Sequence, residues 1–406
     1  MTEDNIDVIH AVTTSISLVL MRGQLEYLKS VGFRVAALCG PGGEIRDPSP
    51  QAITVLTVPM EREVAPLRDL ASLVRICRLL RHARPTICNA GTPKAGLLVG
   101  IAGWLTRVPC RIYTLRGLRL ETATGLKRVI LSVTERITCA CADRVICVSA
   151  SLRQRALELK LLPPKKAIVL ALGSSNGVDL SRFSPTPDRL SLAARIRRQH
   201  GIAPEARVIG YVGRLTRDKG IAELVAAFGI VREHVPDVVL MLIGDYEPGD
   251  PISPETRATI EKGDGVIRID FAPDAAPYYL VMDMLALPTY REGFPNTVLE
   301  AQAAGRPVVT TNATGAVDSI SPDVTGLSVP VGDIKTLAQA LISVLSDRER
   351  ARKMGDAGRE RVRRQFRQER VWKSLADLYC EMLRERGLPI PPALLSQAAP
   401  ICSDTQ

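Results

Sequence analysis

The sequence REGFPNTVLEAQAAGRPVV, residues 291–309, decides the fold class of this chain. It follows an apolar run, residues 284–288, and leads into a second one, residues 307–311, so the pattern is strand, turn, helix, strand. Gly293 allows close backbone approach, and Pro295 suits a first helical position, where its missing N–H would stay unpaired anyway. The pattern predicts one unit of a parallel α/β sheet.

The same turn predicts an anion site. Free amides at Gly293 and Phe294, aligned with a helix dipole, favour a phosphate or diphosphate. Glu292 stands at the rim of that site, and Glu300 lies about two turns into the helix. A carboxylate does not bind a phosphate, since both are negatively charged. Both acids are therefore expected to accept hydrogen bonds from sugar hydroxyls. An isolated pair of this kind would more often be a capping acid and a solvated helix residue.

Short apolar segments alternate with amphipathic ones along the whole chain, which indicates parallel sheets covered on both faces. The pattern predicts two similar sheets and hence two facing Rossmann-like domains, whose ligands bind at the carboxyl ends of the strands. In the first half the expected strands are residues 7–13, 33–40, 53–59, 86–90, 110–115, 144–148 and 167–172. In the second half they are residues 207–212, 238–243, 266–271, 284–288, 307–311 and 327–331.

The expected domain limits follow from turn formers and helix stops. Residues 176–188 are rich in Asn, Gly, Pro, Asp and Ser, which makes them a natural linker. Residues 369–386 have helical apolar spacing and end before three prolines, so they predict a helix that crosses over both domains. The limits are therefore 1–188, 189–366 and 367–406, the last being a crossover helix with a loose tail.

Composition narrows the partners. The formal net charge of +10 and the pI near 9.3 indicate an anionic partner. Aromatic residues make up 4% of the chain and no basic tract is interleaved with them, which argues against nucleic acid. No apolar run is long enough to span a bilayer and the start is no secretory signal, so a cytosolic protein is expected. The nine cysteines contain no C-x2-C pair and are expected to be buried thiols; among the histidines, only His10 is expected to face a cleft.

A second phosphate cradle is expected after the strand at 207–212. Arg214 and Lys219 flank a turn there, where a guanidinium fork and an ammonium point charge can converge on a diphosphate. Two solvated cations would be the alternative. The independent cradle at Gly293 and Phe294 in the same sheet favours a binding function.

Several motifs occur in a familiar order. They are Asn176-Gly177-Val178-Asp179 with Arg182-Phe183, Gly213-Arg214-Leu215 with Asp218-Lys219-Gly220, Gly244-Asp245, and Glu292-Gly293-Phe294-Pro295 with Glu300-Ala301. This set resembles the family-4 retaining glycosyltransferases of GT-B fold. In the first half, residues 13–17, 23–25, 59–63, 92–96 and 113–117 are similar to the bacterial branch that builds capsule, O-antigen and exopolysaccharide units on a lipid diphosphate at the cytosolic membrane face.

The resemblance implies a role for each matching residue. Arg214 and Lys219 would bind the diphosphate and Glu300 the ribose, while Glu292 and the amides of Gly293 and Phe294 would hold the donor sugar and its phosphate. The resemblance makes residues 1–188 acceptor-binding and residues 189–366 nucleotide-sugar-binding, with UDP favoured over GDP. The remaining expected binding residues are Phe271 and Ala272 at the nucleobase, and Gly213, Pro295, Asn296, Arg116 and Thr13.

The chain departs from the family pattern twice. Arg116 stands where many relatives carry a His, and it is free to meet a phosphate or an acidic acceptor instead. Residues 13–23 contain a single Gly where many relatives have a paired-glycine loop, which weakens the case for amide contacts to the diphosphate from that side.

The implied chemistry is a retaining transfer without a protein nucleophile, metal or other cofactor. The departing diphosphate would be stabilised electrostatically and would itself deprotonate the acceptor hydroxyl. Asp245 and Glu247 are the nearest approach to an acidic metal motif, and the resemblance gives them no metal role. Arg119, Lys127 and Arg128 beside the apolar segment 129–137 suit either an anionic lipid surface or solvent.

Three other classes of function stay open at this point. A nucleotide-sugar epimerase of the same architecture would need several acids and a His in the cleft, and the sequence supplies few. A dinucleotide-dependent oxidoreductase would need a G-x-G-x-x-G after a strand, which is missing. A sugar-binding or lipid-surface protein without turnover is the third alternative.

Overall fold

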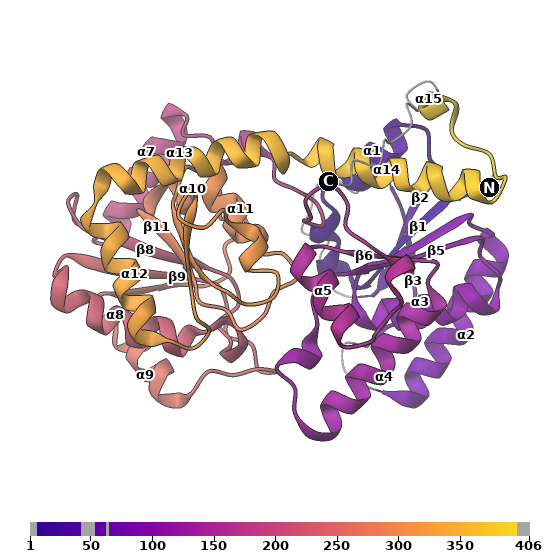
Figure 1. Cartoon of the computed structure of the whole chain (residues 1–406), viewed down its shortest axis with the longest axis horizontal. Helices are drawn as coiled ribbons and strands as arrows, with labels where there is room; N and C mark the ends of the chain where they lie inside the picture. The colour runs from indigo at the N-terminus through magenta and orange to yellow at the C-terminus, as the bar shows by residue number, and fades with distance from the viewer. Residues whose placement is uncertain (1–5, 42–52, 62–64, 396–406) are drawn as a thin grey trace.

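The computed structural model describes residues 6–41, 53–61 and 65–395. Two α/β lobes lie side by side, and a helical strap runs along one side of both (Figure 1). Each lobe is built on one parallel sheet, with strand orders β3-β2-β1-β4-β5-β6-β7 and β10-β9-β8-β11-β12-β13. The α/β class and the pair of Rossmann-like sheets predicted from the apolar pattern are confirmed.

Each predicted strand is present, with ends that differ by a few residues. Parallel strands covered on both faces must be apolar on both faces, and all six residues of β2 and all four of β11 are buried. The first sheet consists of β1 (Val8–Thr14), β2 (Val35–Gly40), β3 (Thr54–Thr57), β4 (Ile87–Ala90), β5 (Cys110–Leu115), β6 (Arg144–Cys147) and β7 (Ala167–Ile168). The second consists of β8 (Arg207–Val212), β9 (Val238–Ile243), β10 (Val266–Ile269), β11 (Met284–Leu287), β12 (Val308–Thr311) and β13 (Gly326–Val329).

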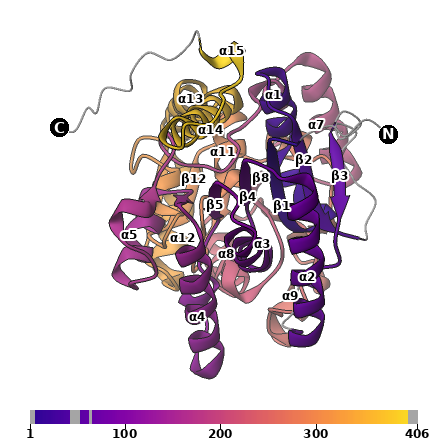
Figure 2. The same cartoon turned by 90° about the vertical axis from the view of Figure 1, so that its right-hand side faces the viewer.

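Helices cover both faces of each sheet (Figures 1 and 2). In the first lobe they are α1 (Gln24–Ser30), α2 (Pro66–Ala83), α3 (Pro93–Leu105), α4 (Gly125–Cys141) and α5 (Ala150–Glu158), with short 3-10 turns η1 (Ser15–Met21), η3 (Arg119–Glu121) and η4 (Pro164–Lys166). The connection and second lobe contain α6 (Leu180–Phe183), α7 (Pro187–Gln199), η5 (Arg217–Lys219), α8 (Ile221–His234), α9 (Pro254–Lys262), α10 (Ala276–Val281), α11 (Asn296–Ala303), η6 (Val317–Ser319) and α12 (Ile334–Ser346). The chain continues with α13 (Arg348–Gln365), α14 (Gln368–Glu385) and α15 (Pro392–Leu395).

The strap consists of α13 over the second lobe and α14 over the first (Figure 1). Between them the Phe366 carbonyl accepts a 2.8 Å hydrogen bond from the Val178 amide, so the two interlobe crossings of the chain are tied together. A Cβ on Gly177 would lie 2.7 Å from the same carbonyl, which keeps that crossing tight. The helix expected at residues 369–386 is one helix, α14, which lies over the first lobe, while the separate helix α13 covers the second. The domain limits at 188 and 366 stay predictions.

Tyr379 anchors α14 to the first sheet. Its hydroxyl accepts a 2.8 Å hydrogen bond from the Asn89 amide and lies 2.7 Å from Nε2 of His10. His10 is buried within β1, and burial lowers its pKa to about 3, so the ring is neutral and shares a hydrogen bond with the Tyr379 hydroxyl. The expectation that His10 faces a cleft is therefore wrong, because β1 continues past it and α14 covers it.

The carboxyl ends of the two sheets meet. A Cβ on Gly293, after β11, would lie 2.2 Å from the carbonyl oxygen of Arg116, which follows β5 of the other lobe. The strand order reverses at β1 in the first sheet and at β8 in the second, and ligands of doubly wound sheets bind at such switch points. The fold therefore places two switch points on facing edges.

Candidate active site

The loops after β8 and β11 are packed directly on each other at the second switch point. Gly220 has φ +69°, and a Cβ there would lie 2.0 Å from the Pro288 carbonyl oxygen, so only glycine fits. The carbonyl of Asp218 accepts from the Tyr290 amide at 2.9 Å and from the Thr289 hydroxyl at 3.1 Å. The two cradles expected from sequence are thus one continuous surface.

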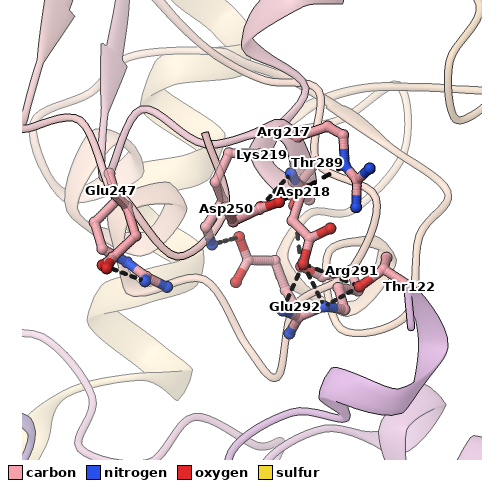
Figure 3. Close-up of polar contacts among 10 residues, drawn as sticks. Thr122, Arg217, Asp218, Lys219, Glu247, Asp250, Thr289, Arg291 and Glu292 are labelled. Atoms are coloured by element: carbon pink, nitrogen blue, oxygen red, sulfur yellow. Dashed lines mark hydrogen bonds and ion pairs between the residues drawn. The ribbon is translucent and has the colours of Figure 1, made fainter. Parts of the chain in front are cut away.

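Lys219 and Glu292 form an ion pair on that surface. Their side chains point toward one another across the two loops (Figure 3), and they are only 20% and 12% exposed. The ammonium and the carboxylate compensate each other's charge in a partly buried place, where an unpaired charge would be costly. A bound diphosphate can take the place of Glu292 as the partner of Lys219, and a sugar hydroxyl can take the place of Lys219 as a donor to Glu292.

Arg214 contacts a different acid. Its Nη1 donates a 2.9 Å bond to Glu247, in the loop after β9, and its side chain is 54% exposed. The Tyr211 hydroxyl donates to the Arg214 carbonyl at 2.8 Å, which fixes the backbone of this turn. Arg214 therefore lies beside the same switch point without touching Lys219 or Glu292, and the sequence did not reveal Glu247 as its partner.

Glu300 is held by a tyrosine from α10. The buried Tyr279 hydroxyl donates a 2.6 Å hydrogen bond to Oε2 of Glu300. Burial raises the pKa of Glu300, and the hydrogen bond from Tyr279 opposes that rise. Glu300 is thus oriented by one oxygen while its other oxygen remains for a ligand. Tyr279 was missed because nothing in the sequence distinguishes it from an ordinary core tyrosine.

The Gly293–Asn296 turn is an interlobe contact as well as a helix start. Phe294 is 8% exposed and packs on Phe366 with ring centroids 5.3 Å apart, so its ring is part of the core. Asn296 Oδ1 accepts a 3.3 Å bond from the hydroxyl of Ser174 in the first lobe. Pro295 is the N-cap of α11 and Asn296 its first helical residue, so the expected start was wrong by one position.

The expected nucleobase region is an exposed turn after β10. Phe271 is 49% exposed, and its amide donates a 3.0 Å bond to Asp245 Oδ1; Ala272 follows it. Gly213 packs beneath this loop system, because a Cβ on Gly244 would lie 2.0 Å from its carbonyl oxygen. These residues border the switch point through backbone atoms.

Across the cleft, the first lobe contributes Thr13 and Arg116. The Thr13 hydroxyl is buried and lies 2.7 Å from the hydroxyl of Thr92, which joins the ends of β1 and β4. The Arg116 guanidinium lies against Gly91, where a Cβ would be 3.1 Å from its Nε and Nη2. Both residues therefore occupy the first switch point.

Polar contacts close one side of the cleft. Asp218 accepts from Arg291 at 2.6 Å and from the Thr122 hydroxyl of the first lobe at 3.0 Å (Figure 3). Thr314 donates a 2.8 Å bond to Glu121 of the first lobe. The sequence gave no signal for these contacts, since each pairs residues that lie far apart in the chain.

Within the described ranges, no group of three or more His, Cys, Asp or Glu residues is arranged to hold a metal ion. Asp245 and Glu247, the closest approach to an acidic motif, accept from the Phe271 amide and the Arg214 guanidinium. Catalysis without metal or other cofactor stays a prediction.

Two family descriptions match the chain. Residues 19–173 match the glycosyl transferase 4-like domain, and residues 193–361 match the glycosyl transferases group 1. The capsular polysaccharide biosynthesis glycosyltransferase CapM of Staphylococcus aureus is 36% identical over 94% of this chain and 98% of its own length. A UDP-Gal:alpha-D-GlcNAc-diphosphoundecaprenol alpha-1,3-galactosyltransferase of Escherichia coli is 24% identical over 80% of this chain and 83% of its own.

Solved structures share the two-lobed fold. Anabaena HepE in complex with UDP-glucose has a TM-score of 0.76 at 19% identity and covers 93% of this chain and 100% of its own. WaaG, a glycosyltransferase involved in lipopolysaccharide biosynthesis, has a TM-score of 0.71 at 15% identity, covering 90% and 98%. The epimerase alternative receives no support. The full-length match to CapM, the two family matches and the paired parallel sheets together show that this chain belongs to the family-4 glycosyltransferases of GT-B fold, in the bacterial branch of capsule, O-antigen and exopolysaccharide enzymes.

Proposed function

We propose that this enzyme transfers a sugar, with retention of anomeric configuration, from a UDP-sugar to a saccharide carried on a lipid diphosphate. The observation that carries the proposal is the Lys219–Glu292 ion pair on the fused loops of the second switch point. A cation and an acid side by side match the two parts of an activated sugar, its phosphate and its hydroxyls. The names of the S. aureus and E. coli relatives support a surface-polysaccharide substrate.

The proposed transfer relies on charge stabilisation of the leaving group. The bond from the donor's anomeric carbon to the phosphate oxygen breaks, and negative charge grows on the departing diphosphate. Lys219, with Arg214 beside it, stabilises that charge, while Glu292 accepts hydroxyl hydrogen bonds from the sugar. The departing phosphate takes the proton of the acceptor hydroxyl. The acceptor oxygen then bonds to the anomeric carbon on the face that the phosphate leaves. No metal takes part in this scheme.

The rest of the donor lies along the second lobe in this proposal. Glu300, oriented by Tyr279, accepts from the ribose hydroxyls, and the Phe271–Ala272 turn meets the nucleobase. UDP is favoured by the E. coli relative, whose name states a UDP-sugar donor.

A lipid-linked acceptor requires access to a membrane surface, and the first lobe offers an apolar face for it. Along α4, the side chains of Leu126, Val129, Ile130, Val133 and Ile137 share one side of the helix and are 41–75% exposed. Exposed basic residues, Lys127 and Arg128, lie in the same first turns. An exposed apolar stripe next to basic residues suits the headgroup region of an anionic bilayer.

Helix α2 also carries exposed apolar side chains. Leu67, Leu70 and Val74 are 86%, 59% and 41% exposed, and α2 and α4 project toward the same end of the lobe (Figure 2). No helix among the described residues combines the length and apolar character needed to cross a membrane. We therefore propose peripheral binding at the cytosolic face of the membrane rather than insertion.

Nucleotide and acceptor experiments test the proposed reaction. A thermal-shift panel of UDP, GDP, ADP and several UDP-sugars is expected to show selective stabilisation by UDP and one UDP-sugar. With that donor, release of UDP should rise when lipid-diphosphate saccharides are added and should persist in EDTA. Equal stabilisation by all nucleotides, or binding without acceptor-dependent UDP release, would reject the proposal in favour of a binding protein.

Vesicle flotation tests the membrane face. Phosphatidylglycerol vesicles are expected to carry the protein upward and phosphatidylcholine vesicles to leave it behind. The double variant Leu126→Ser, Ile130→Ser should lose flotation, whereas Leu190→Ser, which changes a 47% exposed leucine of the second lobe, should retain it. Flotation of the double variant at the wild-type level would disprove the assignment to α4.

A further inference from the structure

Arg116 is a cation without an acidic partner at the first switch point. Its Nε is buried and makes no hydrogen bond, and Nη1 donates one long bond of 3.4 Å to the Leu20 carbonyl. Within the described residues, no carboxylate forms an ion pair with it. Buried charged groups are ordinarily paired, so this guanidinium is suited to pair with an anion from a bound ligand.

The charge on Arg116 persists at neutral pH. Burial lowers its pKa to about 10, which leaves the guanidinium protonated in the cell. His10 is neutral, since burial and the positive charge of Arg116 together lower the His10 pKa to about 3. His10 therefore does not neutralise the charge of Arg116.

The position of the guanidinium separates it from the donor cradle. The Arg116 carbonyl packs against Gly293 of the second lobe, but its guanidinium lies against Gly91 and reaches the Leu20 carbonyl, both in the first lobe. Its contacts thus lie in the segments that follow β1 and β4, and Gly91 immediately precedes Thr92, whose hydroxyl lies 2.7 Å from that of Thr13. A guanidinium fork suits the several oxygens of a phosphate.

We infer that Arg116 binds the diphosphate of the lipid-linked acceptor in the first lobe. This inference rests on the proposed function and adds a residue that selects for a charged acceptor. The donor diphosphate has its own cations, Lys219 and Arg214, on the facing edge. Two separate phosphate sites, one on each switch point, would hold donor and acceptor in opposite lobes with their reacting ends between them.

The direct test is titration of ¹⁵N-labelled protein, following the Arg116 Nε–H resonance assigned by its loss in Arg116→Lys. Farnesyl diphosphate is expected to shift this resonance, whereas farnesol and UDP are expected to leave it in place. Arg116→Gln should weaken farnesyl diphosphate binding about 10-fold or more, as for loss of a charge-assisted hydrogen bond, while UDP affinity stays within about 2-fold.

A second variant keeps the charge and moves it. Gly91→Ala would place a methyl 3.1 Å from Nε and Nη2, so the guanidinium must shift, and farnesyl diphosphate should bind more weakly than to wild type. A shift of Nε–H by UDP, with equal loss of both affinities in Arg116→Gln, would assign the residue to the donor and overturn the inference. No shift with either diphosphate would make Arg116 structural and overturn it too. If UDP does not bind to the protein at all, the proposed function itself is wrong.

Discussion

The hydroxyl of Tyr279 donates a 2.6 Å hydrogen bond to Oε2 of Glu300. Tyr279 is fully buried in α10 and Glu300 projects from α11, so the bond couples two helices at the edge of the site. Burial raises the pKa of Glu300, and this bond favours the ionised form that a ribose hydroxyl needs as acceptor. In the proposed nucleotide site, Tyr279 is therefore a positioning residue for Glu300.

Tyr279→Phe is expected to weaken UDP binding about 10-fold, since a hydrogen bond to a charged group contributes about 1.5–3 kcal/mol. The variant keeps the ring and its packing on Phe183, with centroids 5.7 Å apart, so the fold should persist. Isothermal titration of UDP measures the effect. Measured between pH 5 and 8, the rise of UDP affinity with pH should also be displaced to higher pH than in wild type, because Glu300 loses the bond that favours its ionised form. Wild-type affinity across that range would rule out the positioning role.

Removing either charged site residue should impair donor binding more strongly. Lys219→Ala leaves Glu292 without its ion-pair partner and removes the proposed cation for the diphosphate, and Glu300→Ala removes the proposed ribose acceptor. Each is expected to weaken UDP-sugar binding by about 10-fold or more while the unfolding transition is retained. Lys262→Ala, an exposed lysine at the end of α9, is the matched control. Unchanged affinity in both site variants would remove this surface from consideration.

The sheets were predictable from sequence because their strands are buried on both faces, which makes them continuous apolar runs such as Val35–Gly40. Gly220 was recognised only as part of a motif, and its positive φ and close approach to Pro288 come from the structure. Tyr279, Glu247 and the Thr122–Asp218 bond were not, because each depends on which side chains distant loops bring together. His10 was misjudged for the same reason: only the packing of α14 shows that it is covered.

The close approach of the lobes at Gly293 predicts a sharp steric effect. Gly293→Ala would set a methyl 2.2 Å from the Arg116 carbonyl oxygen and 3.0 Å from the Gly117 amide, both backbone atoms that cannot swing aside. The loops must separate, so transfer activity is expected to fall by about 100-fold or more if alignment is lost by an ångström. UDP-sugar turnover with a lipid-linked acceptor measures this loss.

Gly229→Ala is the matched control for that substitution. A Cβ at Gly229 meets nothing within 4 Å, and the residue is an exposed helical position of α8. Alanine there should stabilise the protein by about 0.5–1 kcal/mol through helix propensity and leave turnover intact. Near-normal activity in Gly293→Ala would show that the two loops do not need to touch during transfer.

A buried acid on α4 predicts a pH dependence of stability. Glu135 of α4 accepts from the Tyr113 hydroxyl at 3.2 Å, and burial raises its pKa from 4.5 to about 7. Since the folded state holds the proton more tightly, the stabilising effect is complete below pH 4.5 and is lost as pH rises through 7. Glu135→Gln keeps the acceptor and stays neutral. Its free energy of unfolding should match wild type near pH 4.5 and exceed it by about 3 kcal/mol at pH 8.

Urea unfolding followed at the first-lobe transition measures this difference, with Glu360→Gln as control. Glu360 is an exposed acid paired with Arg363 and Arg364, and those hydrogen bonds lower its pKa to about 2. A group of that kind loses its contribution only as pH falls from 4.5 toward 2, so the control should run parallel to wild type between pH 5 and 8. If Glu135→Gln also runs parallel over that range, the carboxyl is already ionised in the folded protein, and α4 is anchored by a charged rather than a neutral hydrogen bond.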